Sequence, residues 1–195
     1  MHILIDNGHG KETPGKRSPD ESLLEYKWCR EIAKSIVNNL KARGYNASLL
    51  VPEESDIPLT TRVNRANTFS KLEKTILISI HVNAAGNGEW MNAKGWSAYT
   101  SKGQTPSDIL ADYLYKSIEQ TFPDRKVRKD YSDGDSDIES NFYILRKTVC
   151  PAVLTENFFM DNKEECAFLL KESTKQKVVM AHVNGIINYI KAVGQ

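Results

Sequence analysis

Two histidines and a glutamate follow apolar runs that have the character of buried strands. These residues are His9, His81 and Glu156, and the runs that lead into them are 2–8, 75–80 and 151–155. Continuous aliphatic and β-branched runs of this length are typical of strands buried on both faces of a parallel sheet. Ligands of open α/β sheets bind beyond the carboxyl ends of the strands, so we expect the three side chains to meet at one edge. Imidazole and carboxylate groups there indicate a metal-dependent hydrolase.

A catalytic zinc site usually has three protein ligands and one open position for water, so the two histidines need a third partner. Glu25 is the best candidate, because it lies in the first turn of a predicted helix over 21–43 that must pack back toward the edge holding the histidines. Spacing alone does not exclude Glu12 or Glu21. Glu156 is then a free carboxylate beside the metal, which is the usual position of a general base.

The elements around these residues alternate between strand and helix, which predicts βαβ units and a largely parallel sheet. We predict strands at 2–8, 45–51, 75–80, 95–100, 142–145 and 151–155. We predict helices at 21–43, 58–72, 106–122 and 174–192, with a short helix opening at Asn162. The expected fold class is therefore α/β, a single domain over residues 1–195 with a mostly parallel, twisted central sheet and helices on both faces.

Composition excludes several classes of function. Hydrophobic residues make up 40% of the chain and charged residues 26%, as in ordinary globular proteins. A net charge of +1 gives no electrostatic footprint for nucleic acid, and no apolar stretch is long enough to span a bilayer. The first predicted strand begins almost at Met1, so we expect no signal peptide in this sequence. The protein would then be made in the cytoplasm and act elsewhere, or have lost a leader by trimming.

Six sequence elements in order resemble the zinc-dependent N-acetylmuramoyl-L-alanine amidases of the amidase-3 type, found in bacterial autolysins and phage endolysins. The resemblance covers nearly the whole chain. It rests on Asp6-Asn7-Gly8-His9-Gly10, on Glu25 ahead of Ile32-Ala33, on Arg62-Val63-Asn64-Arg65-Ala66-Asn67, on Ser79-Ile80-His81-Val82-Asn83-Ala84, on Phe142-Tyr143-Ile144-Leu145-Arg146, and on Pro151 to Glu156 followed by Phe159 to Asn162. Each element alone is a weak signal, but the ordered set is specific.

The resemblance implies roles for the candidate residues. His9, Glu25 and His81 would hold Zn²⁺, and Glu156 would be the catalytic acid and base. The bond cleaved would join N-acetylmuramic acid to L-alanine in peptidoglycan. Asn83 lies just past His81, so we expect it to contact substrate or orient the ligand. We expect a monomer that takes peptidoglycan as substrate and has no separate cell-wall-binding domain. It would act at the cell wall either as a prophage lysin or as an exported enzyme.

Two other functions remain open at this stage. A zinc peptidase or deacetylase could share the same metal geometry, and a non-catalytic wall-binding module could share the fold. The presence of all four chemical residues, His9, Glu25, His81 and Glu156, argues against the binding module.

Two further sequence features, one residue and one acidic segment, lead to separate expectations. Phe158 stands where glycine is common in the family, and we expect its side chain to narrow the floor of the cleft. Residues 133–137 look like the start of a calcium loop, but an EF-hand needs Gly at the sixth position and Glu at the twelfth. Those positions hold Ile138 and Ile144, so we predict a solvated acidic loop.

Overall fold

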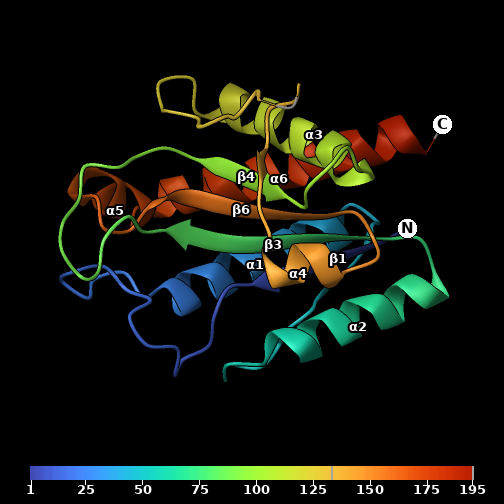
Figure 1. Ribbon diagram of the computed structural model, residues 1–195, viewed down its shortest axis with the longest axis horizontal. Coiled ribbons are helices and arrows are strands. Elements are labelled where there is room, and N and C mark those ends of the chain that lie inside the picture. Colours follow the sequence, from blue (N-terminus) through green and yellow to red (C-terminus); the bar gives the residue numbers. More distant parts are fainter. Residues whose placement is uncertain (133, 195) are drawn as a thin grey trace.

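One six-stranded sheet forms the centre of the protein, in the order β2-β1-β3-β6-β4-β5 (Figure 1). The computed structural model describes residues 1–132 and 134–194. The strands are β1 His2–Asn7, β2 Asn46–Leu49, β3 Thr75–Asn83, β4 Ser97–Thr100, β5 Ile138–Glu139 and β6 Ala152–Phe159. The helices are α1 Glu25–Ala42, α2 Leu59–Leu72, α3 Pro106–Thr121, α4 Tyr143–Lys147, α5 Lys163–Leu169 and α6 Glu172–Val193. This arrangement confirms the expected α/β fold class.

The sheet is mostly parallel, as the alternating elements predicted. β1 pairs in parallel with β2 and β3, and β3 pairs in parallel with β6. The exception is the antiparallel pairing of β4 with β6. Because β5 pairs in parallel with β4, these two strands both run against the other four. In the register between β3 and β6, His81 lies opposite Glu156. The two strands therefore bring a predicted ligand and the predicted base to the same level of the sheet.

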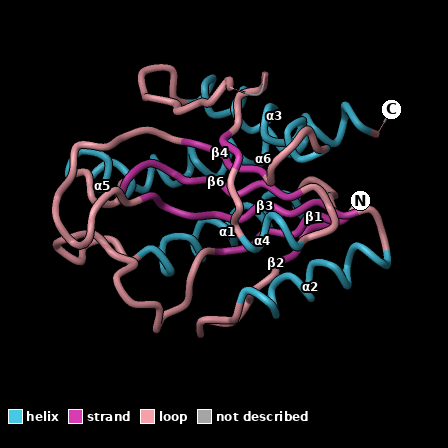
Figure 2. Tube along the Cα trace, viewed as in Figure 1, coloured by secondary structure: helices cyan, strands magenta, loops and turns pink. Residues whose placement is uncertain are grey.

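Helices cover both faces of the sheet. Alternate residues of a strand point to opposite faces, so the strands contribute apolar side chains to a core on each side. Ile3, Ile5 and Ile78 pack with α1, α3, α5 and α6 in one core, whereas Leu4 and Leu77 pack with α2 and α4 in the other. Figure 1 shows α2 and α4 in front of the sheet. The long loops after β1 and β3 gather at the carboxyl edge (Figure 2), where a site is expected.

Three element boundaries differ from expectation. β3 and β6 continue past the apolar runs, so His81 and Glu156 lie within strands rather than after them. Helix α1 begins at Glu25 instead of near Glu21, because residues 18–23 close a turn in which the Ser18 amide donates to the Leu23 carbonyl.

The predicted strand over 142–145 is wrong, since residues 143–147 form helix α4. A short apolar run does not distinguish a buried strand from a buried helix. Here Ile144 and Leu145 are buried with α2 residues such as Val63, which a single helical turn achieves. Among the described residues, no helix is both long and apolar enough to cross a membrane.

Phe158 does not narrow the cleft, which corrects our expectation. It is fully buried and stacks edge-to-face against Phe122 and Phe168, on the face of the sheet away from the cleft. Its φ of 62° lies in the left-handed region, where glycine is favoured because it has no Cβ. Glycine would fit this position because of its backbone conformation, and a glycine here would not widen the cleft.

Candidate metal centre and active site

His9 is held in an unusual backbone conformation at the end of β1. Its φ is 60°, which costs energy for a residue other than glycine. Two arginines fix the peptide, since Arg30 and Arg62 both donate to the His9 carbonyl oxygen, at 2.9 and 3.3 Å. Gly8 is required beside it, because a Cβ there would lie 2.5 Å from Nδ1 of His81. The glycine thus lets the two histidine rings approach.

Glu25, the first residue of α1, lies between the two histidines. Its Oε1 lies 3.2 Å from Nδ1 of His81, and its Oε2 lies 3.3 Å from Nε2 of His9. The Val82 amide also donates to Oε1, which fixes the carboxylate against β3. The side chain is buried, and burial opposes its charge, but hydrogen bonds and attraction from the histidines outweigh this and lower the pKa of Glu25 to about 2.

His81 faces His9 across Glu25. The two imidazole rings are perpendicular, with their centroids 5.0 Å apart. Burial lowers the pKa of His81, but the Glu25 hydrogen bond and the charges of Glu156 and Glu25 outweigh it, so the pKa is raised overall. The rings and the carboxylate form one compact group, whose nitrogen and oxygen donor atoms all lie within 4.8 Å of one another.

This group fits a metal ion. Two imidazole nitrogens and one carboxylate are a donor set typical of catalytic Zn²⁺. Glu25 Oε2 is buried, and apart from the nearby His9 ring it has no hydrogen-bond partner among the described residues, so this oxygen is available to a cation. The rival candidates lie elsewhere: Glu12 accepts a hydrogen bond from the Asp56 amide, and the side chain of Glu21 is 65% exposed and pairs with Arg17. The structure therefore brings the three predicted residues together and places Glu12 and Glu21 outside the group.

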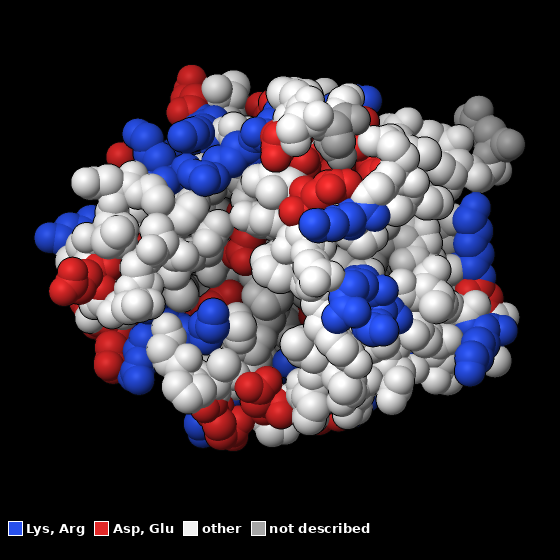
Figure 3. Space-filling model, in the orientation of Figure 1, with Lys and Arg blue, Asp and Glu red and all other residues white. Residues whose placement is uncertain are grey.

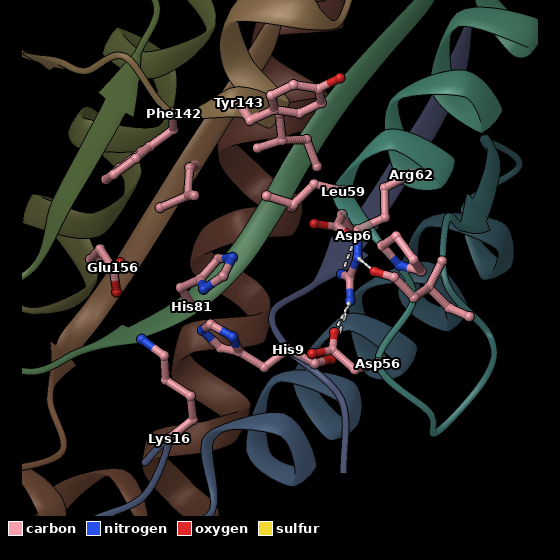
Figure 4. Close-up of a pocket in the computed structure, with 14 residues that line it drawn as sticks. Asp6, His9, Lys16, Asp56, Leu59, Arg62, His81, Phe142, Tyr143 and Glu156 are labelled. Carbon is pink, nitrogen blue, oxygen red and sulfur yellow. Dashed lines mark hydrogen bonds and ion pairs between the residues drawn. The ribbon is translucent and has the colours of Figure 1, made fainter. Parts of the chain in front are cut away.

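A cavity of about 580 Å³ opens beside the group. His9, His81 and Glu156 line it, and Figure 4 shows the three side chains at one end. Figure 3 shows the hollow in the middle of this face, with acidic atoms on its floor and basic atoms at its edge. Burial raises the pKa of Glu156 to about 8, against the attraction of His81, and its Oε2 has no hydrogen-bond partner among the described residues. The carboxyl group is thus free to exchange a proton with a molecule in the cavity.

An internal ion pair supports the floor of the cavity. Arg62 on α2 is 2% exposed and donates to Asp6 Oδ1 at 2.8 Å and to the Asn7 carbonyl at 2.6 Å (Figure 4). Ser79 donates to the other oxygen of Asp6. Arg62 therefore ties α2 to the end of β1 just before His9, and its role is structural.

Sequence reasoning missed the wall of the cavity. Lys16, Phe142 and Tyr143 line it, and Figure 4 shows the Lys16 ammonium close to the histidines. Lys16 gave no sequence signal, because it lies in a polar loop without pattern. Asn83 is not among the lining residues, and its side-chain oxygen accepts from the Ala84 amide. Its contact with substrate stays a prediction.

The fold and the site define an α/β domain with a candidate metal centre and a free carboxylate at the carboxyl edge of its sheet. A family model described as N-acetylmuramoyl-L-alanine amidase matches residues 3–188. The chain is 30% identical over 187 residues to an endolysin of Bacillus phage SPP1, covering 94% of this chain and 64% of the endolysin. It is 30% identical over 193 residues to the amidase CwlM of Bacillus licheniformis, covering 95% and 67% of the two chains.

Solved structures agree with these relatives. The N-acetylmuramoyl-L-alanine amidase of Clostridium difficile 630 superposes with a TM-score of 0.84 at 26% identity, covering 98% of this chain and 97% of that one. The chain belongs to the N-acetylmuramoyl-L-alanine amidase family. Members of this family are generally metal-dependent, which agrees with the His9, Glu25 and His81 group.

Proposed function

We propose that this domain is a zinc-dependent amidase that hydrolyses the bond between N-acetylmuramic acid and L-alanine in peptidoglycan. The observation that carries the proposal is the compact group of His9, Glu25 and His81, with Glu156 facing the same cavity. We also propose that it acts at the cell wall as a monomer, because one chain supplies every residue of the site.

Each residue of the candidate site has a defined role in this proposal. His9, Glu25 and His81 would hold Zn²⁺, and Arg62 would keep the His9 peptide in place. Zn²⁺, when bound, supplies the Lewis acidity that activates water and polarises a carbonyl group. Lys16, at the edge of the cavity, offers a positive charge to an anionic group of the substrate. Phe142 and Tyr143 offer apolar surface to the same molecule.

Glu156 would move the proton. Its carboxylate takes a proton from the attacking water, and the same carboxyl group returns that proton to the nitrogen of the leaving L-alanine. Glu156 lines the cavity, and its Oε2 has no hydrogen-bond partner among the described residues, so no hydrogen bond to that oxygen must break first. A divalent cation nearby would lower the pKa of Glu156 by charge attraction, which favours the ionised form that a base requires.

Substitution of Glu156 tests the assignment. We expect Glu156→Gln to keep fold and zinc content but to lose hydrolysis of purified peptidoglycan by at least about 100-fold, the usual contribution of a general acid–base residue. Glu89→Gln, an exposed residue, serves as the matched control and should keep full activity. Near-normal turnover by Glu156→Gln with zinc bound would refute the role of Glu156.

Metal removal and product analysis test the rest. Dialysis against a chelator should abolish hydrolysis, and added Zn²⁺ should restore it. The products should be stem peptides with free L-alanine amino ends. New sugar amines would instead indicate a deacetylase, and cleavage within the stem peptide would indicate a peptidase. Wall binding without any metal-dependent lysis would indicate a binding module.

A further inference from the structure

A group of three aspartates lies outside the cavity. Two of them are buried, whereas the sequence predicted a solvated acidic loop. Asp137 is only 1% exposed, and Asp108 at the start of α3 is 8% exposed. Asp135 is half-buried beside them. Each of the three offers a carboxylate oxygen, and these oxygens lie within 4.8 Å of one another. Asp133, which belonged to the same sequence pattern, lies outside the described residues.

The hydrogen bonds of this group leave two buried oxygens free. Asp137 accepts from the Thr100 hydroxyl on Oδ2, and Asp135 accepts from Gln104 on Oδ2. Oδ1 of Asp137 and Oδ1 of Asp135 are buried and have no donor among the described residues. A buried carboxylate oxygen without a partner is costly, and such oxygens are normally satisfied by a donor, a water or an ion.

The charge of the group is also uncompensated. Within the part of the chain that the structure describes, no lysine, arginine or histidine forms an ion pair with Asp108, Asp135 or Asp137. Burial and the repulsion of Asp135 and Asp108 outweigh the Thr100 hydrogen bond and raise the pKa of Asp137 to about 7. Near neutral pH the group must therefore retain a proton or take up a cation.

We propose that Asp108, Asp135 and Asp137 form a Ca²⁺ site that is distinct from the candidate metal centre. Ca²⁺ binds six to eight oxygen ligands, often several carboxylates together with carbonyl groups and water, whereas Zn²⁺ prefers nitrogen and sulfur. The site is not an EF-hand, because Asp108 comes from α3 rather than from the loop itself. The ion would join the end of the 123–140 segment to α3 and to β4 through Thr100.

The position of the group suggests what the ion would do. Asp137 directly precedes β5, which pairs with β4, and the chain then leads to Phe142 on the wall of the cavity. Phe142 also stacks on Tyr99 of β4, with ring centroids 5.4 Å apart. An ion at Asp137 would therefore fix the near end of a short segment whose far end lines the cleft.

Calcium binding to the zinc-loaded protein tests the proposal directly. Titration calorimetry with CaCl₂ should show one site, and the melting temperature should rise by about 5–10 °C at 100 times the dissociation constant. Asp135→Asn, in the half-buried loop position, should weaken binding at least about 10-fold and remove most of the rise in melting temperature. Asp137→Asn should do the same if it folds. Asp130→Asn removes the same charge from an exposed position in the same segment and should bind Ca²⁺ like the original chain.

Two outcomes would overturn the proposal. The first is no binding up to about 10 mM Ca²⁺, which lies above the weakest class of calcium modules. The carboxyl groups would then share a proton instead. The second is equal affinity in Asp135→Asn and Asp130→Asn, which would place the ion elsewhere. Both readouts are independent of peptidoglycan hydrolysis, so failure of the amidase proposal would leave them unaffected.

Discussion

Replacing Arg62 by methionine should destabilise the protein severely, because the Arg62 guanidinium is buried against the Asp6 carboxylate. Arg62 is 2% exposed and its partner Asp6 is 1% exposed. Methionine fills a similar volume but leaves the Asp6 carboxylate buried with Ser79 as its remaining side-chain partner. It also removes donors from the carbonyl groups of Asn7 and His9. The cost is therefore that of an uncompensated buried charge, rather than that of a lost surface contact.

The magnitude follows from this burial. Breaking a buried ion pair by removing one partner costs about 3–5 kcal/mol. Native domains are stable by only about 5–15 kcal/mol, so the loss is a large fraction of the free energy of unfolding. For a chain of this length, each kcal/mol lowers the melting temperature by about 2–4 °C. We expect Arg62→Met to melt about 6–20 °C below the original chain.

Arg65 provides the matched control. It lies on the same helix and forms a 2.6 Å ion pair with Glu53, but the two side chains are 33% and 37% exposed. Such a pair contributes about 1 kcal/mol or less, so Arg65→Met should melt within about 4 °C of the original chain. Urea unfolding of both variants measures the difference. Equal stability of Arg62→Met and Arg65→Met would refute the reasoning, as would a double variant Arg62→Met with Asp6→Leu that recovers no stability.

Two further predictions concern the core. Phe158→Ala should lose about 3–5 kcal/mol with the buried ring, and Phe158→Gly should be the more stable of the two, because glycine accepts the φ of 62° without strain. At a position with negative φ the alanine variant would be the more stable. Urea unfolding in which Phe158→Ala is as stable as Phe158→Gly, or more stable, would therefore contradict the argument. Burial lowers the pKa of His182 to about 4, although a hydrogen bond to the Val178 carbonyl opposes this shift. Between about pH 4 and 6.5 the folded protein therefore holds a neutral His182 ring, whereas the same ring is protonated in the unfolded chain. The free energy of unfolding should therefore fall as the pH drops from about 6.5 toward 4, by about 2 kcal/mol at pH 5. His182→Leu should reduce this loss when unfolding is measured at about pH 6.5 and at about pH 5. An unchanged pH dependence in that variant would show that His182 is not responsible.

The sequence was sufficient for the strands that carry the chemistry. Apolar runs before His9 and His81 are long and regular, so both the strands and their common edge were predictable. Glu25 could be favoured but not chosen on spacing, because Glu12 and Glu21 are close enough in sequence to reach the same edge. The turn over residues 18–23 separates Glu25 from Glu21, since it makes Glu25 the first helical residue, and Glu12 is separated by its hydrogen bond with the Asp56 amide.

Other features depend on tertiary contacts that no local pattern encodes. Helix α4 forms because Ile144 and Leu145 find α2 to pack against, although the same run has the composition of a strand. The burial of Asp137 depends on Thr100 and Asp108, which lie at least 29 residues away in the sequence. The segment 133–137 was therefore predicted to be solvated, although its last residue, Asp137, is buried.

Both ends of the described chain lie on the same side of the molecule, on the right in Figure 1, where the parallel strands begin. β1 begins beside Lys74, and α6 finishes on the same side. A purification tag or a fused targeting module at either end would consequently be held away from the mouth of the cleft. The domain is thus suited to fusion or tethering at either end without obstruction of the cleft.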